Sequence, residues 1–445
     1  MSTSSSSHPA QAGRAQFILN QLPSGGLFAG QTWRIAPEPF PLGKELYDEL
    51  ESLGRVLLQF NRAANLLYRQ SVAGKQPPWV AQWLDKGKPT KIVSVQRTTA
   101  LKHELPRVIR PDLLLTEDGL VLTELDAVPG GIGLTAWLNQ TYSMMGVEVI
   151  GGADGMLHGF GSIFGESPVV HVVVSEESAV YRPEMAWACR ELNALGYCFA
   201  LRDTEPFEFA EGDGVYRFFE LFDLDRVPIT DTLFEAAVRK RILLTPPPKA
   251  FFEEKMLLAL LWNDRLYDFW RRELGASFFL RLKNLVPYTW VVDPTPLPPQ
   301  AVIPEINLTD WQELKNLSQR DRELILKVSG FSPEAWGSRG VYLGSDLSAA
   351  DWAQVVDNAL AGFEQSPYVL QRFARPKLVP ATWFDFEKSE LVAMHGRVRL
   401  CPYYFVSGDG DEARAKLGGV LATICPADKK FIHGMSEAIL APCCV

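Results

Sequence analysis

The sequence predicts an α+β fold, in which helices and strands alternate over most of the chain. Three patterns support this: apolar residues at helical spacing in residues 44–69, two apolar runs around a turn at residues 117–119, and a strand–helix–strand succession over residues 169–202. The chain has 445 residues, of which 47% are hydrophobic and 22% charged. At about 150 residues per domain, this length suggests roughly three structural units with a substantial core.

The individual elements follow from local patterns. Leucines recur every three or four positions in residues 44–69, which predicts a long amphipathic helix. The run VVHVVV from Val169 predicts a buried strand, followed by a helix that ends at Gly196 and a second strand. Six prolines between residues 287 and 304 predict an extended connection, after which strand and helix patterns alternate again. The expected segments are a disordered lead (1–15), a helical region (16–105), a portion with a charged hairpin (106–165), an α/β unit (166–235) and the remaining body (236–445).

The charge balance and the cysteines exclude several classes of partner. The 53 acidic and 44 basic residues give a formal net charge of −9, so no nucleic-acid partner is expected, and an anionic ligand must be bound by a few local cations. No apolar run reaches the roughly 18 residues of a membrane helix, and the N-terminal residues lack the apolar segment of a signal peptide, so no membrane partner is expected. Six cysteines without a CxxC pair predict reduced thiols in the cytoplasm. The oligomeric state stays open, with a homodimer as one alternative.

Several common catalytic motifs do not occur in the sequence. It has no GxxxxGK[ST] loop, no GxSxG elbow, no HExxH pair and no kinase HRD and DFG set. P-loop nucleotidases are therefore excluded, and common hydrolases and kinases lose most of their support. The glycines in HGFGSIFG precede a predicted strand, whereas those of a dinucleotide-binding loop follow one, so we interpret them as a turn.

A predicted hairpin with four charged residues at its open end is the most informative segment. If its turn has three residues, 117–119, then Asp112 lies opposite Glu124 and Arg110 lies opposite Asp126. All four side chains then share one face, and the leucines that continue this face toward the turn are Leu114, Leu120 and Leu122.

A two-residue turn would place Asp112 on the face opposite Glu124, and the apolar pattern does not decide between the two registers. Three carboxylates close together repel each other by amounts on the order of 1 kcal/mol or more, so in the first register they require a divalent cation such as Mg²⁺. The alternative is a solvated hairpin tip with ordinary surface charge.

These residues carry a resemblance to a known family, the synthetase domain of glutathionylspermidine synthetase and its relatives, which are circularly permuted ATP-grasp proteins. The family motif is Arg-x-Asp followed, at the same twelve-residue interval, by Glu-x-Asn, and Arg110, Asp112, Glu124 and Asp126 match it. Asp126 departs from the asparagine of the family and adds a negative charge. No Cys-His amidase region precedes Arg110, so hydrolysis of the product is not expected.

Three further segments resemble the same family in the same order. EEKMLLALLW places Lys255 before a Leu-rich helix, and LKVSGFSPEAWGSRG places Lys327 at a strand end before a glycine-bearing loop with Gly337 and Gly340. The loop lacks the Gly-Arg-Glu-Gly run of the family. YVLQRF resembles the strand that meets adenine and places Gln371 there.

The resemblance implies an ATP-grasp fold with mixed sheets, an additional α/β (Rossmann-like) layer, and ATP and Mg²⁺ as cofactors. Asp112, Glu124 and Asp126 would hold the metal, and Arg110, Lys255, Lys327, Gly337, Gly340 and Gln371 would hold the nucleotide.

The implied reaction is a carbon–nitrogen ligation, in which a small-molecule carboxylate forms an acyl phosphate and an amine displaces phosphate. Arg110 would stabilise the transferred phosphoryl group. Arg397 and Arg399 alternate along a predicted strand, and we expect one of them to face inward and hold the acyl phosphate or the carboxylate. The alternatives are an inactive nucleotide-binding or assembly module and, less favoured, a phosphotransferase that acts on a hydroxyl.

Overall fold

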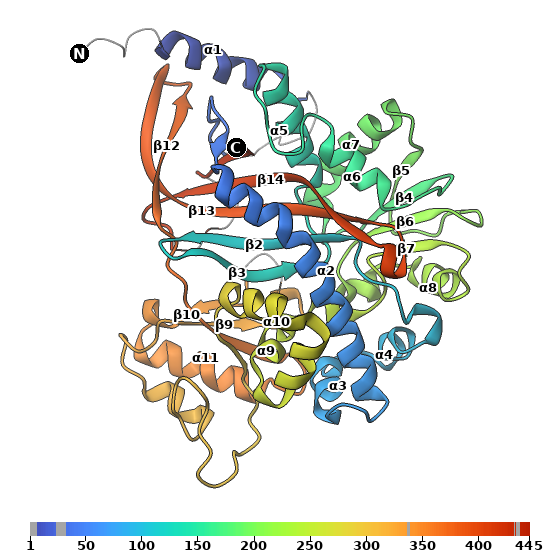
Figure 1. Cartoon of the computed structure of the whole chain (residues 1–445), viewed down its shortest axis with the longest axis vertical. Coiled ribbons are helices and arrows are strands. Elements are labelled where there is room, and N and C mark those ends of the chain that lie inside the picture. Colours follow the sequence, from blue (N-terminus) through green and yellow to red (C-terminus); the bar gives the residue numbers. More distant parts are fainter. Residues whose placement is uncertain (1–6, 24–32, 336–338, 431, 433–436) are drawn as a thin grey trace.

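The computed structural model describes residues 7–23, 33–335, 339–430, 432 and 437–445. Within these residues the strands form three sheets, around which the helices are arranged (Figure 1). Helices and strands alternate through the chain, as the sequence predicted. None of the described helices is long and apolar enough to cross a membrane.

The largest sheet has seven strands. Six of them follow the order β1-β15-β14-β13-β2-β3, and the seventh, β12, pairs with the N-terminal part of β13. Their bounds are β1 Phe40–Pro41, β2 Val108–Thr116, β3 Gly119–Asp126, β12 Leu378–Asp385, β13 Glu390–Ser407, β14 Arg414–Pro426 and β15 Ile439–Cys444. β2 and β3 form the predicted hairpin, and β3 lies at an edge of the sheet. The edge with the charged hairpin faces the lower part of the molecule (Figure 1).

A second sheet has four antiparallel strands in the order β10-β9-β11-β8. They are β8 Thr289–Val291, β9 Leu324–Val328, β10 Val341–Leu343 and β11 Tyr368–Arg372. One face packs on α11 (Ala349–Ala361), where Trp352 is fully buried against the apolar residues of the strands. α9 (Met256–Trp262) and α10 (Tyr267–Leu285) link this sheet to the main core.

The third sheet is parallel, with the order β5-β4-β6-β7. Its strands are β4 Val170–Val174, β5 Phe199–Arg202, β6 Gly214–Phe218 and β7 Leu243–Thr245, and the helices around it are α5 Ile132–Met144, α6 Gly155–Ser162, α7 Arg182–Ala194 and α8 Thr230–Val238. The predicted strand–helix–strand unit is therefore present as β4, α7 and β5. In HGFGSIFG, Gly159 and Gly161 lie in α6, so the expectation of a turn was wrong for them, whereas Gly165 lies in the turn that follows the helix.

The N-terminal region is helical, with α2 over Lys44–Val72, α3 over Pro78–Asp85 and α4 over Thr90–Gln96. The apolar stripe of α2 is buried in the main core, as its spacing predicted. The lead expected to be disordered is partly ordered: α1 spans Ser7–Asn20, and Ala15 and Ile18 are fully buried. These two apolar positions give α1 a packed side, which the polar composition of residues 1–15 did not indicate. Residues 1–6 lie outside the described part.

Candidate active site

The open end of the β2–β3 hairpin has the charged pairing that the longer turn predicted. Asp112 lies opposite Glu124, and Arg110 lies opposite Asp126. Nη2 of Arg110 lies 2.8 Å from an Asp126 carboxylate oxygen and 3.2 Å from Oδ1 of Asp112. The sequence-predicted hairpin residues therefore come together on one face.

The turn itself differs from the prediction, and a β-bulge compensates for the difference. Thr116 pairs with Gly119, so the turn holds only residues 117–118. A regular ladder from this turn would leave Asp112 and Glu124 on different faces. The register shifts between Asp112 and Leu113, where Thr123 is the extra residue of β3, and this one-residue bulge restores the charged pairing.

The bulge also separates the leucines from the charged residues. The leucines paired across the hairpin, Leu113 with Leu122 and Leu115 with Leu120, are buried in the main core on the opposite face. The expectation that Leu120 and Leu122 continue the charged face was therefore wrong. A bulge changes the alternation of faces along a strand, and apolar spacing alone does not reveal it.

Asp112 lies between two arginines. Nη1 of Arg399 approaches its Oδ2 at 2.8 Å, and Arg110 approaches its Oδ1. Burial alone would raise the pKa of Asp112, but Arg110 and then Arg399 outweigh it, so the pKa lies below its ordinary value. Asp126 has the opposite balance, because burial and the neighbouring carboxylates raise its pKa despite Arg110. The two aspartates thus meet different electrostatic environments within one site.

Of the two candidate arginines on β13, only Arg399 reaches the hairpin. Arg397 donates hydrogen bonds to the backbone carbonyls of Ala427 and Lys429 instead. We expected that one of the two arginines, and only one, would face inward, whichever register the strand took. That reasoning was wrong, because residues two apart share a face of a strand. The difference arises because Arg399 lies beside β2, whereas Arg397 pairs with β12 and β14.

Two arginine nitrogens in the site remain unpaired. Nε of Arg110 and Nε of Arg399 are buried and have no hydrogen-bond partner among the described residues. An unsatisfied buried donor costs roughly 1–3 kcal/mol, and more when it is charged. Charged N–H donors suit an anion such as a phosphoryl or carboxylate group, so these arginines fit an anionic ligand.

The two predicted phosphate lysines lie across from the hairpin and contact it directly. Nζ of Lys255, at the N-terminus of α9, lies 2.9 Å from Glu124 Oε1 and donates to the carbonyl of Ala335 at 3.1 Å. Nζ of Lys327, on β9, donates to the carbonyl of the bulged Thr123 at 3.1 Å. The bulge therefore also supplies the backbone acceptor of this lysine.

Gln371, on β11, lies beside Lys327. Its Oε1 accepts a hydrogen bond from Lys327 Nζ at 2.9 Å, and its Nε2 donates to Thr289 Oγ1 at 3.0 Å. Burial lowers the pKa of Lys327 to about 8, and Glu124 offsets this only in part. Lys327 is thus the cation of the site whose charge is sensitive to pH near neutrality.

Of the two loop glycines, only Gly340 is among the described residues, and it does not extend the site. The backbone N–H of Gly340 donates to the carbonyl of Glu334 at 2.8 Å, and its carbonyl accepts from Val328. Gly337 lies outside the described residues. The backbone N–H of Gly340 is therefore not directed at the hairpin.

The loop after β3 is anchored to the parallel unit. Its Gly131 N–H donates to Glu184 Oε1 on α7 at 2.8 Å, and Tyr403 Oη on β13 donates to the Gly130 carbonyl at 2.7 Å. Burial raises the pKa of Glu184 to about 7, although the backbone donors oppose this. These residues fix the strand end that carries Asp126, and no sequence pattern singled them out.

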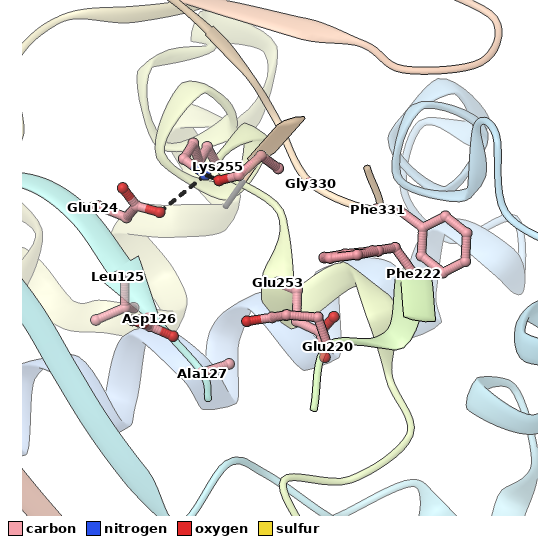
Figure 2. A pocket seen from close by; sticks show the side chains of 11 residues that line it. Glu124, Leu125, Asp126, Ala127, Glu220, Phe222, Glu253, Lys255, Gly330 and Phe331 are labelled. Carbon is pink, nitrogen blue, oxygen red and sulfur yellow. Dashed lines mark hydrogen bonds and ion pairs between the residues drawn. The ribbon is translucent and has the colours of Figure 1, made fainter. Parts of the chain in front are cut away.

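A small cavity opens beside Glu124 and Asp126 (Figure 2). The volume open to the centres of water-sized molecules is about 50 Å³, which is enough for a cation and a few waters but too small for a nucleotide. The lining residues that sequence reasoning missed are Glu220, Phe222, Glu253 and Phe331. Glu220 lies two residues beyond the end of β6, and this position near the carboxyl end of a parallel strand was the available signal.

The donor set suits Mg²⁺, which prefers carboxylate oxygens together with phosphate oxygens and water. Asp112, Glu124 and Asp126 supply such oxygens on one face of the hairpin. No group of three or more Asp, Glu, His or Cys side chains arranged for a metal ion is found among the described residues. Each carboxylate is instead paired with Arg110, Arg399 or Lys255.

Comparison with solved structures shows one whose overall fold is similar to that of this chain. A glutathione synthetase-like effector from Globodera pallida matches with a TM-score of 0.57 and 11% sequence identity, over 100% of this chain and 98% of that chain. At this identity, the likeness concerns the fold alone.

Two weaker likenesses have TM-scores below 0.5. One is to a Methylobacillus flagellatus protein named for γ-glutamylcysteine synthetase, with a TM-score of 0.41 and 12% identity over 86% of this chain and 87% of that chain. The other is to a D-cycloserine synthetase, with a TM-score of 0.31 and 15% identity over 62% of this chain and 90% of that chain. No family model and no curated protein matches the sequence.

Proposed function

We propose that the chain is an ATP- and Mg²⁺-dependent ligase that joins a carboxylate to an amine through an acyl phosphate. The single observation that supports this best is the facing arrangement of the carboxylate hairpin and the two lysines, Lys255 and Lys327. We also propose that the fold is circularly permuted, because the hairpin precedes the lysines and the Gln371 strand in the chain. In this proposal residues 106–165 carry the metal-binding part, 166–235 the substrate side and 236–445 the remaining nucleotide-binding part.

The residues of the site have distinct roles in this reaction. Arg110 and Arg399 hold the transferred phosphoryl group or the acyl carboxylate through their unpaired Nε–H groups. Lys255 and Lys327 exchange their present acceptors for phosphate oxygens when a nucleotide enters. Glu124 and Asp126, with Asp112, would hold Mg²⁺, which supplies charge neutralisation of the phosphates. The carboxylate attacks the γ-phosphorus and releases ADP, and the amine then attacks the acyl carbon and releases phosphate.

A second candidate is an inactive nucleotide-binding or assembly module. It is favoured by the complete pairing of the three hairpin carboxylates with cations and by Asp126 in place of the family asparagine. In such a protein the contacts of Lys255 and Lys327 with the hairpin would keep the space between the lysines and the hairpin closed.

Isothermal titration with MgATP, together with phosphate release over panels of carboxylic acids and amines, separates these candidates. The ligase requires MgATP binding and phosphate release that depends on an added acid. Binding without any release would support the module, and no binding would contradict both. A stable phosphorylated alcohol would instead identify a phosphotransferase.

A further inference from the structure

The cavity in Figure 2 is lined by four carboxyl groups. Three of them have an ion-pair partner at 2.6–2.9 Å, and these pairs are Glu124–Lys255, Asp126–Arg110 and Glu253–Arg217. Glu220 has no ion pair among the described residues. A negative charge at Glu220 is therefore unneutralised until a cation enters the cavity.

Glu220 and Glu253 lie side by side in the wall of the cavity (Figure 2). Burial raises the pKa of Glu220 well above its ordinary value, and the charges of Glu253 and Asp126 raise it further. A carboxylate in such surroundings is stabilised when a cation approaches it. The arrangement thus suits a positively charged ligand that enters the cavity.

The remaining walls distinguish between kinds of cation. Phe222 and Phe331 lie beside the carboxylates, and Leu125 adds an aliphatic side chain (Figure 2). Aromatic faces attract organic cations and pack against their carbon atoms, whereas Mg²⁺ needs oxygen ligands and keeps its waters. The mixture of carboxylates and phenyl rings therefore fits an alkylammonium ion better than a second metal ion.

The position in the fold also indicates a ligand site. Glu220 follows β6 at the carboxyl ends of the parallel strands. The neighbouring strands β4 and β6 connect to opposite sides of the sheet, since β4 leads to β5 and β6 leads to β7. Open parallel sheets bind ligands at such a crossover point. On the same strand, Tyr216 is fully buried, its hydroxyl has no hydrogen-bond partner among the described residues, and the charges of Asp126 and Glu220 act on it. An unpaired hydroxyl group thus lies within range of the charges of two residues that line the cavity.

We propose that this cavity binds the ammonium group of the acceptor amine, with Glu220 and Glu253 as its anionic partners and Phe222 and Phe331 against its carbon atoms. The inference rests on the proposed ligase function and adds that the acceptor enters as a cation, which passes one proton to a carboxylate of the cavity before its nitrogen attacks the acyl carbon. The ammonium would lie beside Asp126, on the hairpin that carries the phosphoryl-binding Arg110. Glu220 and Glu253 then select for charge in the acceptor.

Ligand-observed NMR with ethylammonium tests the proposal without knowledge of the natural substrates. The wild-type chain should bind ethylammonium and should not bind ethanol, its uncharged counterpart of similar size. Glu220→Gln should weaken ethylammonium binding at least about tenfold, because it removes the unneutralised charge. Phe222→Leu should weaken binding while it keeps every charge, and Glu205→Gln, which changes an exposed glutamate of the same unit, should have no effect.

Unchanged ethylammonium binding in Glu220→Gln would overturn the proposal, as would equal binding of ethanol. MgATP titration of the same variant keeps the two proposals separate. Glu220→Gln should bind MgATP like the wild-type chain, whereas failure of the wild-type chain to bind MgATP would contradict the proposed function and not the ammonium site.

Discussion

Removal of one partner from the buried ion pair between Lys88 and Glu254 should strongly destabilise the site. The side chains are 0% and 1% exposed, and Glu254 also accepts a hydrogen bond from Ser329 Oγ. Ser329 in turn binds the backbone of Lys255 and of Met256. The pair therefore fixes the segment that carries Lys255 against the end of β9, two residues beyond Lys327.

Lys88→Met should lower the free energy of unfolding by about 3–5 kcal/mol, because it leaves the Glu254 carboxylate buried without a counter-ion. The double variant Lys88→Met with Glu254→Gln removes both charges and keeps a carbonyl acceptor for Ser329. It should recover most of the loss, since replacing both partners of a buried pair is often close to neutral.

Urea unfolding followed by tryptophan fluorescence measures both variants against the wild-type chain. A loss below about 1 kcal/mol in Lys88→Met would refute the reasoning, because that is the range of exposed ion pairs. A double variant as unstable as the single one would also refute it, since packing and not the uncompensated charge would then be responsible.

Three further predictions concern the site. Arg399→Lys should lower acid-dependent phosphate release by about 10²-fold, because a lysine cannot replace the forked donor, whereas the matched Arg397→Lys should keep near wild-type rates. MgATP affinity should fall as the pH rises from about 7 to about 9, because the Lys327 ammonium, with its pKa lowered to about 8, loses its charge over this range, and Lys327→Arg should remove the effect. Glu124→Gln and Asp112→Asn should each abolish MgATP turnover. Glu124→Gln should change stability by less than about 1 kcal/mol, since Glu124 is 36% exposed, whereas Asp112→Asn should cost more by leaving Arg399 without its carboxylate. Similar rates in the two arginine variants, a flat pH profile, or wild-type turnover in either carboxylate variant would contradict the respective prediction.

The charged hairpin shows how far sequence reasoning reaches and where it stops. The pairing of Asp112 with Glu124 was one of two registers that the spacing left open, because two strands joined by a short turn have few registers. The combination of a turn at residues 117–118 with a bulge at Thr123 was not predictable, since each shifts the ladder by one residue and the two shifts cancel at the open end. The right pairing was therefore reached with the wrong turn.

Contacts between distant segments account for most of what the sequence did not reveal. Glu220 and Glu253 lie in different segments from the hairpin, and only the assembly of the parallel sheet against β3 brings them to the cavity. The division between Arg397 and Arg399 depends on which strand pairs with each part of β13. Local periodicity records the burial of one element against its surroundings, but it contains no information about which elements become neighbours.

Trapping of the acyl phosphate with hydroxylamine tests the central claim most directly. The chain is incubated with MgATP, a panel of carboxylic acids and hydroxylamine, and hydroxamate and phosphate are measured together. The account predicts equal amounts of hydroxamate and phosphate with at least one acid, and neither product with Asp112→Asn. MgATP binding without hydroxamate from any acid would contradict the ligase.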